Sequence, residues 1–131
     1  MTIVCGIQYN GVEKMAIEVV MMAEIEEIVN GLILELRRGT LILSVLSRLD
    51  QPKYGYSLVQ ELSEKGIEID AGTLYPLLRR LEKQGLLESS WELADSRPRR
   101  YYFLSETGRQ VYDRLREEWR KLVFSIENLM N

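Results

Sequence analysis

The sequence contains no histidine and only one cysteine, Cys5, among its 131 residues. Without histidine the chain lacks the commonest general base, the Ser-His and Cys-His nucleophile pairs, and the commonest metal ligand. A single cysteine cannot form a disulfide within the chain, and it leaves too few ligands for a zinc site. We therefore expect a protein that is not an enzyme and that has no metal or other cofactor.

Long apolar runs are also missing. No stretch approaches the roughly 18 apolar residues of a membrane-spanning helix, and no basic segment followed by an apolar run marks a secretory leader. Together with the unpaired thiol, these absences predict a cytoplasmic protein without membrane association. The length fits a single domain, or one small domain with an appendage.

The formal net charge is -3 at pH 7, which at first opposes nucleic-acid binding. However, residues 1–33 hold one lysine and five glutamates, whereas residues 34–131 hold 16 basic and 15 acidic residues. Residues 96–104 contain Arg97, Arg99 and Arg100 without any acid. Positive charge is therefore concentrated where it could meet a phosphate backbone.

The segment from Asp70 to Leu87 has the pattern of one amphipathic helix with its start and stop. Asp70 is expected to be the N-cap, and Gly85 the left-handed residue that ends the helix. Four leucines spaced i, i+3, i+4, i+7 predict a buried stripe: Leu74, Leu77, Leu78 and Leu81. The opposite face is small and cationic, which fits a DNA major groove or an ordinary solvated surface. Its polar members are Thr73, Arg79, Arg80 and Lys83.

Pro76 leaves the first turn of this helix open to two interpretations. It costs a helical hydrogen bond if Asp70 is the cap, and none if Thr73 is the cap.

The segments before and after this helix favour binding in a DNA groove over an ordinary solvated surface. A shorter helix from about Tyr56 to Lys65 precedes it, and the two together form a helix-turn-helix. A strand Leu87 to Glu92, a loop Leu93 to Pro98 and a strand Arg99 to Leu104 follow it. A hairpin with an arginine-bearing tip behind a recognition helix is typical of a wing. We predict a mainly α fold with a small β-hairpin, a winged helix-turn-helix with a C-terminal helix.

The N-terminal third is harder to assign. From Met22 to Leu49 the pattern is helical, with interruptions at Gly31 and Gly39. Residues 1–20 are interpreted as an appendage inessential to the main activity, with three alternatives: a small strand, a disordered tail, or a start codon placed too early. In the domain division the N-terminal extension covers residues 1–24. The domains we expect are this extension, a winged domain over residues 25–104, and a dimerisation helix over residues 105–131.

The last helix is expected to start at Ser105, its cap, and to end near Met130. It carries a heptad seam of Tyr112, Leu115, Trp119, Leu122, Ile126 and Leu129. At about 1.5 Å per residue this helix is longer than a small winged domain can cover. A free seam of that length predicts a homodimer, and residues Ile25 to Leu36 could complete its apolar surface.

Four motifs resemble the PadR-like family of winged-helix transcriptional regulators. They are LRRGTL (Leu36 to Leu41), YGYSL (Tyr54 to Leu58), GTLYPLLRRLEKQGLL (Gly72 to Leu87) and RRYYFLSETG (Arg99 to Gly108). The resemblance covers about Ile25 to Asn131, and the extension before it is a departure from the short members. It implies a homodimer that binds a palindromic operator on double-stranded DNA, usually as a repressor released by a small molecule.

Matched position by position, the resemblance also implies a set of DNA contacts. They are Tyr54, Tyr56, Thr73, Tyr75, Arg79, Arg80, Lys83, Arg97, Arg99 and Arg100. In drug-sensing members an indole on the C-terminal helix stacks on flat aromatic effectors, and Trp119 has a matching place. Trp119 could instead simply pack across the dimer interface.

The main alternative is a winged-helix module that binds a protein rather than DNA. DNA binding requires one continuous cationic face, formed by Arg79, Arg80, Lys83, Arg97, Arg99 and Arg100. If Glu82, Glu88, Glu92 and Asp95 break up this cationic cluster, protein binding gains support.

Overall fold

The computed structural model describes residues 3–4, 7–8, 10–94 and 97–131. The chain divides into two compact units, Met1–Gly39 and Thr40–Asn131. In the first unit the short strands β1 (Ile3–Val4) and β2 (Ile7–Gln8) pair antiparallel and are followed by helix α1 (Gly11–Arg38). None of the α1 residues is buried.

Helix α1 begins at Gly11, well before the expected start at Met22. The Asn10 side chain accepts a hydrogen bond from the Glu13 amide at 2.8 Å, and the Glu13 carboxylate accepts one from the Asn10 amide at 3.3 Å. This capping box satisfies two backbone donors that would otherwise lack partners, so it starts a helix where the apolar pattern is weak. The expected interruption at Gly39 is confirmed, because α1 ends at Arg38 and the next helix begins at Thr40. The interruption expected at Gly31 is wrong, because α1 runs through that residue.

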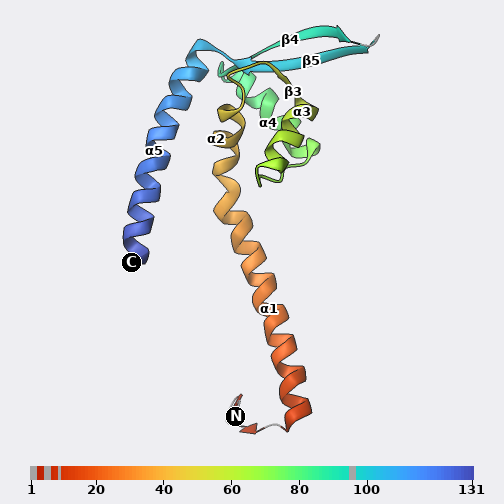
Figure 1. The fold of residues 1–131 in the computed structure, drawn as a ribbon, viewed down its shortest axis with the longest axis vertical. Coiled ribbons are helices and arrows are strands. Elements are labelled where there is room, and N and C mark those ends of the chain that lie inside the picture. Colours follow the sequence, from red (N-terminus) through yellow and green to blue (C-terminus); the bar gives the residue numbers. More distant parts are fainter. Residues whose placement is uncertain (1–2, 5–6, 9, 95–96) are drawn as a thin grey trace. The chain divides into compact units, whose positions relative to one another are not determined.

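The second unit is mainly helical with one small sheet, as predicted for a winged helix (Figure 1). Three strands form an antiparallel sheet in the order β3-β5-β4. Its elements are α2 (Thr40–Ser47), β3 (Lys53–Tyr54), α3 (Gly55–Glu64), α4 (Ala71–Lys83), β4 (Leu87–Ala94), β5 (Arg97–Leu104) and α5 (Glu106–Met130).

The hairpin of β4 and β5 is longer than the sequence indicated. Leu93 pairs with Pro98 and Ala94 with Arg97, so most of the expected loop belongs to the strands. The rest of that loop, residues 95–96, lies outside the described residues. The short strand β3 also joins the sheet, with Tyr54 paired to Tyr101.

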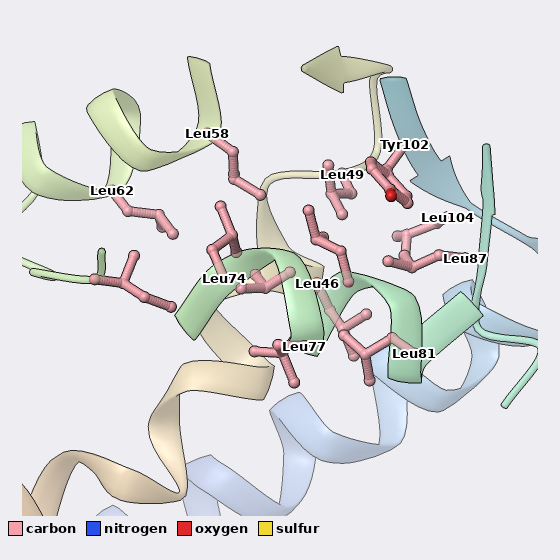
Figure 2. Close-up of a cluster of buried hydrophobic side chains, with 13 residues drawn as sticks. Leu46, Leu49, Leu58, Leu62, Leu74, Leu77, Leu81, Leu87, Tyr102 and Leu104 are labelled. Carbon is pink, nitrogen blue, oxygen red and sulfur yellow. The ribbon is translucent and has the colours of Figure 1, made fainter. Parts of the chain in front are cut away.

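The core of the second unit lies between the helices and the base of the sheet (Figure 2). Leu74 and Leu78 of α4 are fully buried, and Leu77 and Leu81 are nearly so. This confirms the predicted leucine stripe. The stripe packs against leucines of α2 and α3 and, from the strands, against Leu87, Tyr102 and Leu104.

Both ends of α4 match their sequence signals. The Asp70 carboxylate accepts a hydrogen bond from the Thr73 amide at 2.7 Å, so Asp70 is the cap and Thr73 is not. Pro76 therefore lies inside the helix, where it cannot donate to the carbonyl of Gly72. At the other end Gly85 has a φ of +81°, and the Leu86 amide donates to the Leu81 carbonyl at 3.0 Å.

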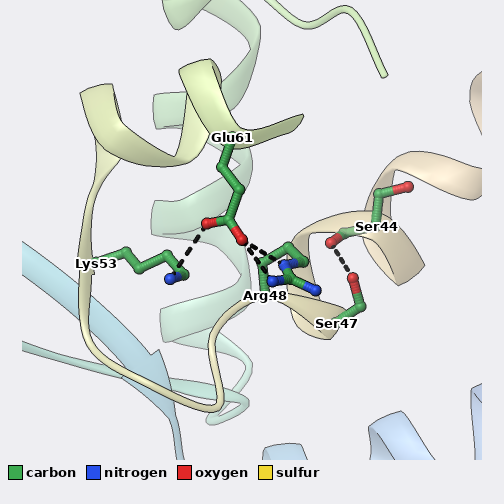
Figure 3. A network of polar contacts seen from close by, with 5 residues as sticks. All are labelled: Ser44, Ser47, Arg48, Lys53 and Glu61. Carbon is green, nitrogen blue, oxygen red and sulfur yellow. Dashed lines mark hydrogen bonds and ion pairs between the residues drawn. The ribbon is translucent and has the colours of Figure 1, made fainter. Parts of the chain in front are cut away.

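A polar cluster ties α2, β3 and α3 together (Figure 3). The Glu61 carboxylate lies 2.6 Å from the Arg48 guanidinium and 3.2 Å from the Lys53 ammonium. Burial raises the pKa of Glu61, but the hydrogen bonds and charges of Lys53 and Arg48 outweigh burial and lower that pKa overall. This cluster joins the C-terminal half of α3 to strand β3 and to the chain just after α2.

Two kinds of feature are absent from the described residues. Among those residues, no helix combines the length and apolar character needed to cross a membrane. Nor does the described part of the chain bring three or more histidine, cysteine or acidic side chains together as a metal site.

Candidate nucleic-acid interface

The outer face of α4 carries the cations that the sequence predicted. Thr73, Arg79, Arg80 and Lys83 are all exposed. Within the described part of the chain, the three cationic side chains form no hydrogen bond or ion pair. They are therefore available for a partner, while the leucine stripe on the opposite face fixes the helix.

Tyr75 lies on the same helix but is half-buried and packs against the core. Its ring contacts Gly55 at the start of α3, where a Cβ would lie 2.7 Å from the Tyr75 Cζ. No side chain larger than hydrogen fits there unless Tyr75 moves. Tyr75 thus sets the position of α3 relative to α4, and its contact with DNA stays a prediction.

The start of α3 opens into a hollow of about 670 Å³. The N-cap residue Tyr54 makes no side-chain cap, so the first-turn amides of α3 have no such acceptor. The positive end of a helix dipole and free amides together favour an anion. The hollow is lined by Tyr54, Gly55, Tyr56, Ser57, Tyr75, Trp91, Arg97, Pro98, Arg99 and Arg100.

Two tyrosines at this hollow, Tyr54 and Tyr56, differ in how firmly their side chains are held. Tyr56 is 67% exposed, and its hydroxyl accepts a hydrogen bond from Gln60 at 3.1 Å. The Tyr54 hydroxyl donates to the Glu92 carboxylate at 2.7 Å, and the Arg99 guanidinium lies 5.6 Å from the Tyr54 ring centroid. The hydrogen bond to Glu92, together with desolvation, raises the pKa of Tyr54. Tyr54 thereby joins the start of α3 to the wing.

Arg100 is half-buried and is held by several side chains of the protein. Its guanidinium lies 2.7 Å from the Glu82 carboxylate of α4 and donates to the Ser89 hydroxyl at 3.0 Å. The same group lies 5.7 Å from the Trp91 ring centroid and 5.4 Å from that of Tyr102. Arg100 therefore anchors the wing to α4, and a direct DNA contact from it stays a prediction.

Two of the acids that could interrupt the cationic surface are engaged by other side chains of the wing and of β3. Glu82 is paired with Arg100, and Glu92 accepts the Tyr54 hydroxyl. Glu88 is exposed on β4, and Asp95 lies outside the described residues. Glu82 and Glu92 thus hold the wing in place, and none of the three described acids pairs with the α4 cations.

The seam of α5 is exposed from Leu115 onward. Leu122 is 55% and Leu129 84% exposed, whereas Tyr112 is half-buried against the core. Beside Trp119, which is 43% exposed, a second hollow of about 480 Å³ lies between α2 and α5. It is lined by Thr40, Leu43, Ser44, Ser47, Ile67, Tyr112, Arg116, Trp119 and Arg120.

The sequence did not predict the roles of two residues of the interface. Glu82, considered there only as an acid that could break up the cationic cluster, pairs with Arg100, and Trp91 lines the first hollow. The sequence did offer a signal for Trp91, because a tryptophan lies in a predicted strand close to the arginines of the wing. In the structure its side chain is 65% exposed, although large aromatic side chains tend to be well covered.

Comparisons with known proteins agree on one family. The model of the transcriptional regulator PadR-like family matches residues 42–114. The transcriptional regulator Rv3488 of Mycobacterium tuberculosis is 42% identical over 76 residues, which is 57% of this chain and 71% of that protein.

Solved structures give the same result. A PadR family transcriptional regulator from Eggerthella lenta has a TM-score of 0.79 and 46% identity, covering 83% of this chain and 97% of its own. A transcriptional regulator from Clostridium thermocellum has a TM-score of 0.65 and 30% identity, covering 72% and 96% respectively.

Proposed function

The chain belongs to the PadR-like family of transcriptional regulators, and from this premise we propose how it acts. It binds a palindromic DNA operator as a homodimer, represses a gene, and is released by a small molecule. Helix α4 enters the major groove, while the start of α3 and the wing contact phosphates.

One observation supports the proposed DNA-binding surface. On α4 the apolar face is fully used by the core, while Arg79, Arg80 and Lys83 project outward without partners among the described residues. Arginine reads guanine through two parallel hydrogen bonds, so Arg79 or Arg80 supplies base specificity. The hollow with Arg97 and Arg99 at its rim supports a phosphate contact beside the groove.

The exposed apolar residues of α5 support the homodimer. A symmetric dimer covers the same seam on both subunits, which removes apolar surface from water. Helix α1 adds a second set of exposed apolar residues, including Ile25, Val29 and Leu32. The long helices of two subunits would together form a bundle.

The hollow beside Trp119 supports an aromatic effector. Trp119 and Tyr112 offer ring faces, and the hydroxyls of Ser44 and Ser47 offer polar contacts. Arg116 and Arg120 also line the hollow, so a flat aromatic anion fits its charge better than a flat cation. A bound effector at this place would bias the arrangement of α5 and thereby the spacing of the two α4 helices.

The direct test is selection of DNA fragments from a random pool by the purified protein. The wild-type protein is expected to enrich a palindrome whose half-sites lie about one helical turn apart. The double variant Arg79→Ala, Arg80→Ala is expected to lose about a hundredfold or more in affinity for that site. Its matched control is Lys65→Ala, which removes an exposed cation at the far end of α3. Failure of the wild-type protein to enrich any sequence would refute the proposal.

A further inference from the structure

The inner face of the β4–β5 hairpin continues beyond the core as an apolar strip. Side chains alternate along a strand, so the pairing of Leu87 with Leu104 and of Trp91 with Arg100 puts these four residues on one face. At the base of the hairpin Leu87 and Leu104 are buried, but farther out Trp91 is 65% and Leu93 75% exposed. Pro98, opposite Leu93, is exposed as well.

Trp91 is held in place although it is uncovered. The Arg100 guanidinium lies 5.7 Å from its ring centroid, and Arg100 is itself fixed by Glu82 at 2.7 Å and by Ser89 at 3.0 Å. A fixed indole loses little conformational entropy when a partner covers it. The indole thus forms a preformed apolar patch.

The surroundings of this patch indicate what covers it. Trp91 lines the hollow that Arg97 and Arg99 also line and into which the uncapped start of α3 opens. An apolar patch beside cations and free amides matches a strand of nucleic acid, in which apolar sugar carbons lie between phosphates. A protein partner would have to supply several acidic groups around one apolar contact to match the same surface.

We propose that Trp91 packs against a deoxyribose of the DNA backbone, between phosphates held by the wing arginines and by the start of α3. This inference rests on the proposed function, because it presupposes a bound duplex. The Trp91 contact is uncharged, whereas the contacts of the wing arginines on this surface are made by cations. Loss of the Trp91 contact should therefore change the affinity for DNA without changing how that affinity depends on salt.

The experiment measures Kd at several salt concentrations for a duplex that the wild-type protein selects from a random pool. Trp91→Ala is expected to raise Kd about tenfold at every salt concentration, with an unchanged slope of log Kd against log salt. Trp91→Phe keeps an aromatic face and is expected to lose less. Arg97→Ala, the ionic control, is expected to reduce the slope by about one for each phosphate that the variant no longer neutralises.

A second readout follows the indole itself. The sequence has two tryptophans, so a Trp119→Phe background, with its own Kd as the reference, leaves Trp91 as the only source of indole emission. Saturation with the duplex is expected to quench or shift this emission. The inference is overturned if Trp91→Ala binds as tightly as the wild type, or if it lowers the slope as Arg97→Ala does. If the wild-type protein binds no duplex, the proposed function itself fails.

Discussion

Helices α4 and α5 both repeat apolar residues at three- and four-residue spacing, yet the chain buries only one of the two stripes. Leu74 and Leu78 of α4 are 0% exposed, whereas Leu122 and Leu129 of α5 are 55% and 84% exposed. The difference shows what each helix can offer. A helix whose apolar face is covered within its own chain presents a polar face to a ligand, and a helix whose apolar face is uncovered requires a partner.

The largest effect is expected from a change inside the covered stripe. Leu78→Ala should lower the free energy of unfolding by about 3 kcal/mol, because the cavity forms at a fully buried site. Urea denaturation at low and high protein concentration should give the same loss. The matched change Leu122→Ala lies in the exposed seam, and its loss should depend on protein concentration. Equal behaviour of the two variants would contradict the contrast between the helices.

A charge placed in the uncovered stripe should act on association rather than on folding of the subunit. Ile126→Glu is expected to weaken the dimer about thirtyfold, or roughly 2 kcal/mol, because the dimer would bury an unpaired carboxylate. Sedimentation equilibrium measures this change. Asn128→Glu, which places the same charge away from the seam, is the control and should leave the dimer intact. A dimer that tolerates both changes would exclude the α5 seam as its interface.

A smaller effect is expected where α4 meets the wing. Glu82→Gln removes the ionic partner of Arg100, a pair that is about one-third exposed and therefore partly screened by solvent. We expect a loss of about 0.5 kcal/mol in stability and about a threefold weaker affinity for DNA, because the hairpin is less firmly held. Glu88→Gln removes an exposed carboxylate from the same hairpin as the control. Equal DNA affinity of the Glu82→Gln and Glu88→Gln variants would show that the ion pair with Arg100 is not needed to hold the wing.

The smallest effect is expected in the stability of the fold at acidic pH. The pKa of Glu61 is lower in the folded protein than the ordinary value of 4.5, so its ion pairs stabilise the fold above that value. Their contribution is lost as the pH falls below about 4.5 and through the folded pKa. Glu61→Gln should cost a few tenths of a kcal/mol near neutral pH and flatten the acid limb of a plot of stability against pH. An unchanged acid limb would show that Glu61 does not contribute to it.

Local signals predicted the parts of the fold whose causes are local. Asp70 as the cap, Gly85 as the stop and the four leucines of α4 all depend on residues within one helix, and the structure confirms them. The capping box of Asn10 and Glu13 is also a local signal, but the apolar pattern that follows it is weak, so the expected start of the helix rests on the stronger pattern from Met22. As a result, the start of α1 was predicted too late.

Long-range partners could not be read from spacing. Arg100 has the same sequence surroundings as Arg99, but only the packing of the hairpin on α4 brings Arg100 to Glu82. The contact of Tyr75 with Gly55 likewise joins two residues that are 20 positions apart in the chain and lie on different helices. Both cases turn predicted DNA contacts into residues that also hold the surface together, and both require tertiary structure to be seen.

We propose that the outer face of α4, the start of α3 and the wing bind one DNA duplex together, α4 in the major groove and the other two on the phosphates. The most direct measurement is the Kd of the wild-type protein for its selected duplex between about 50 and 200 mM salt. If each subunit of a dimer neutralises about three or four phosphates, the slope of log binding constant against log salt should be roughly -5 to -7. A binding constant that does not change with salt would contradict the claim.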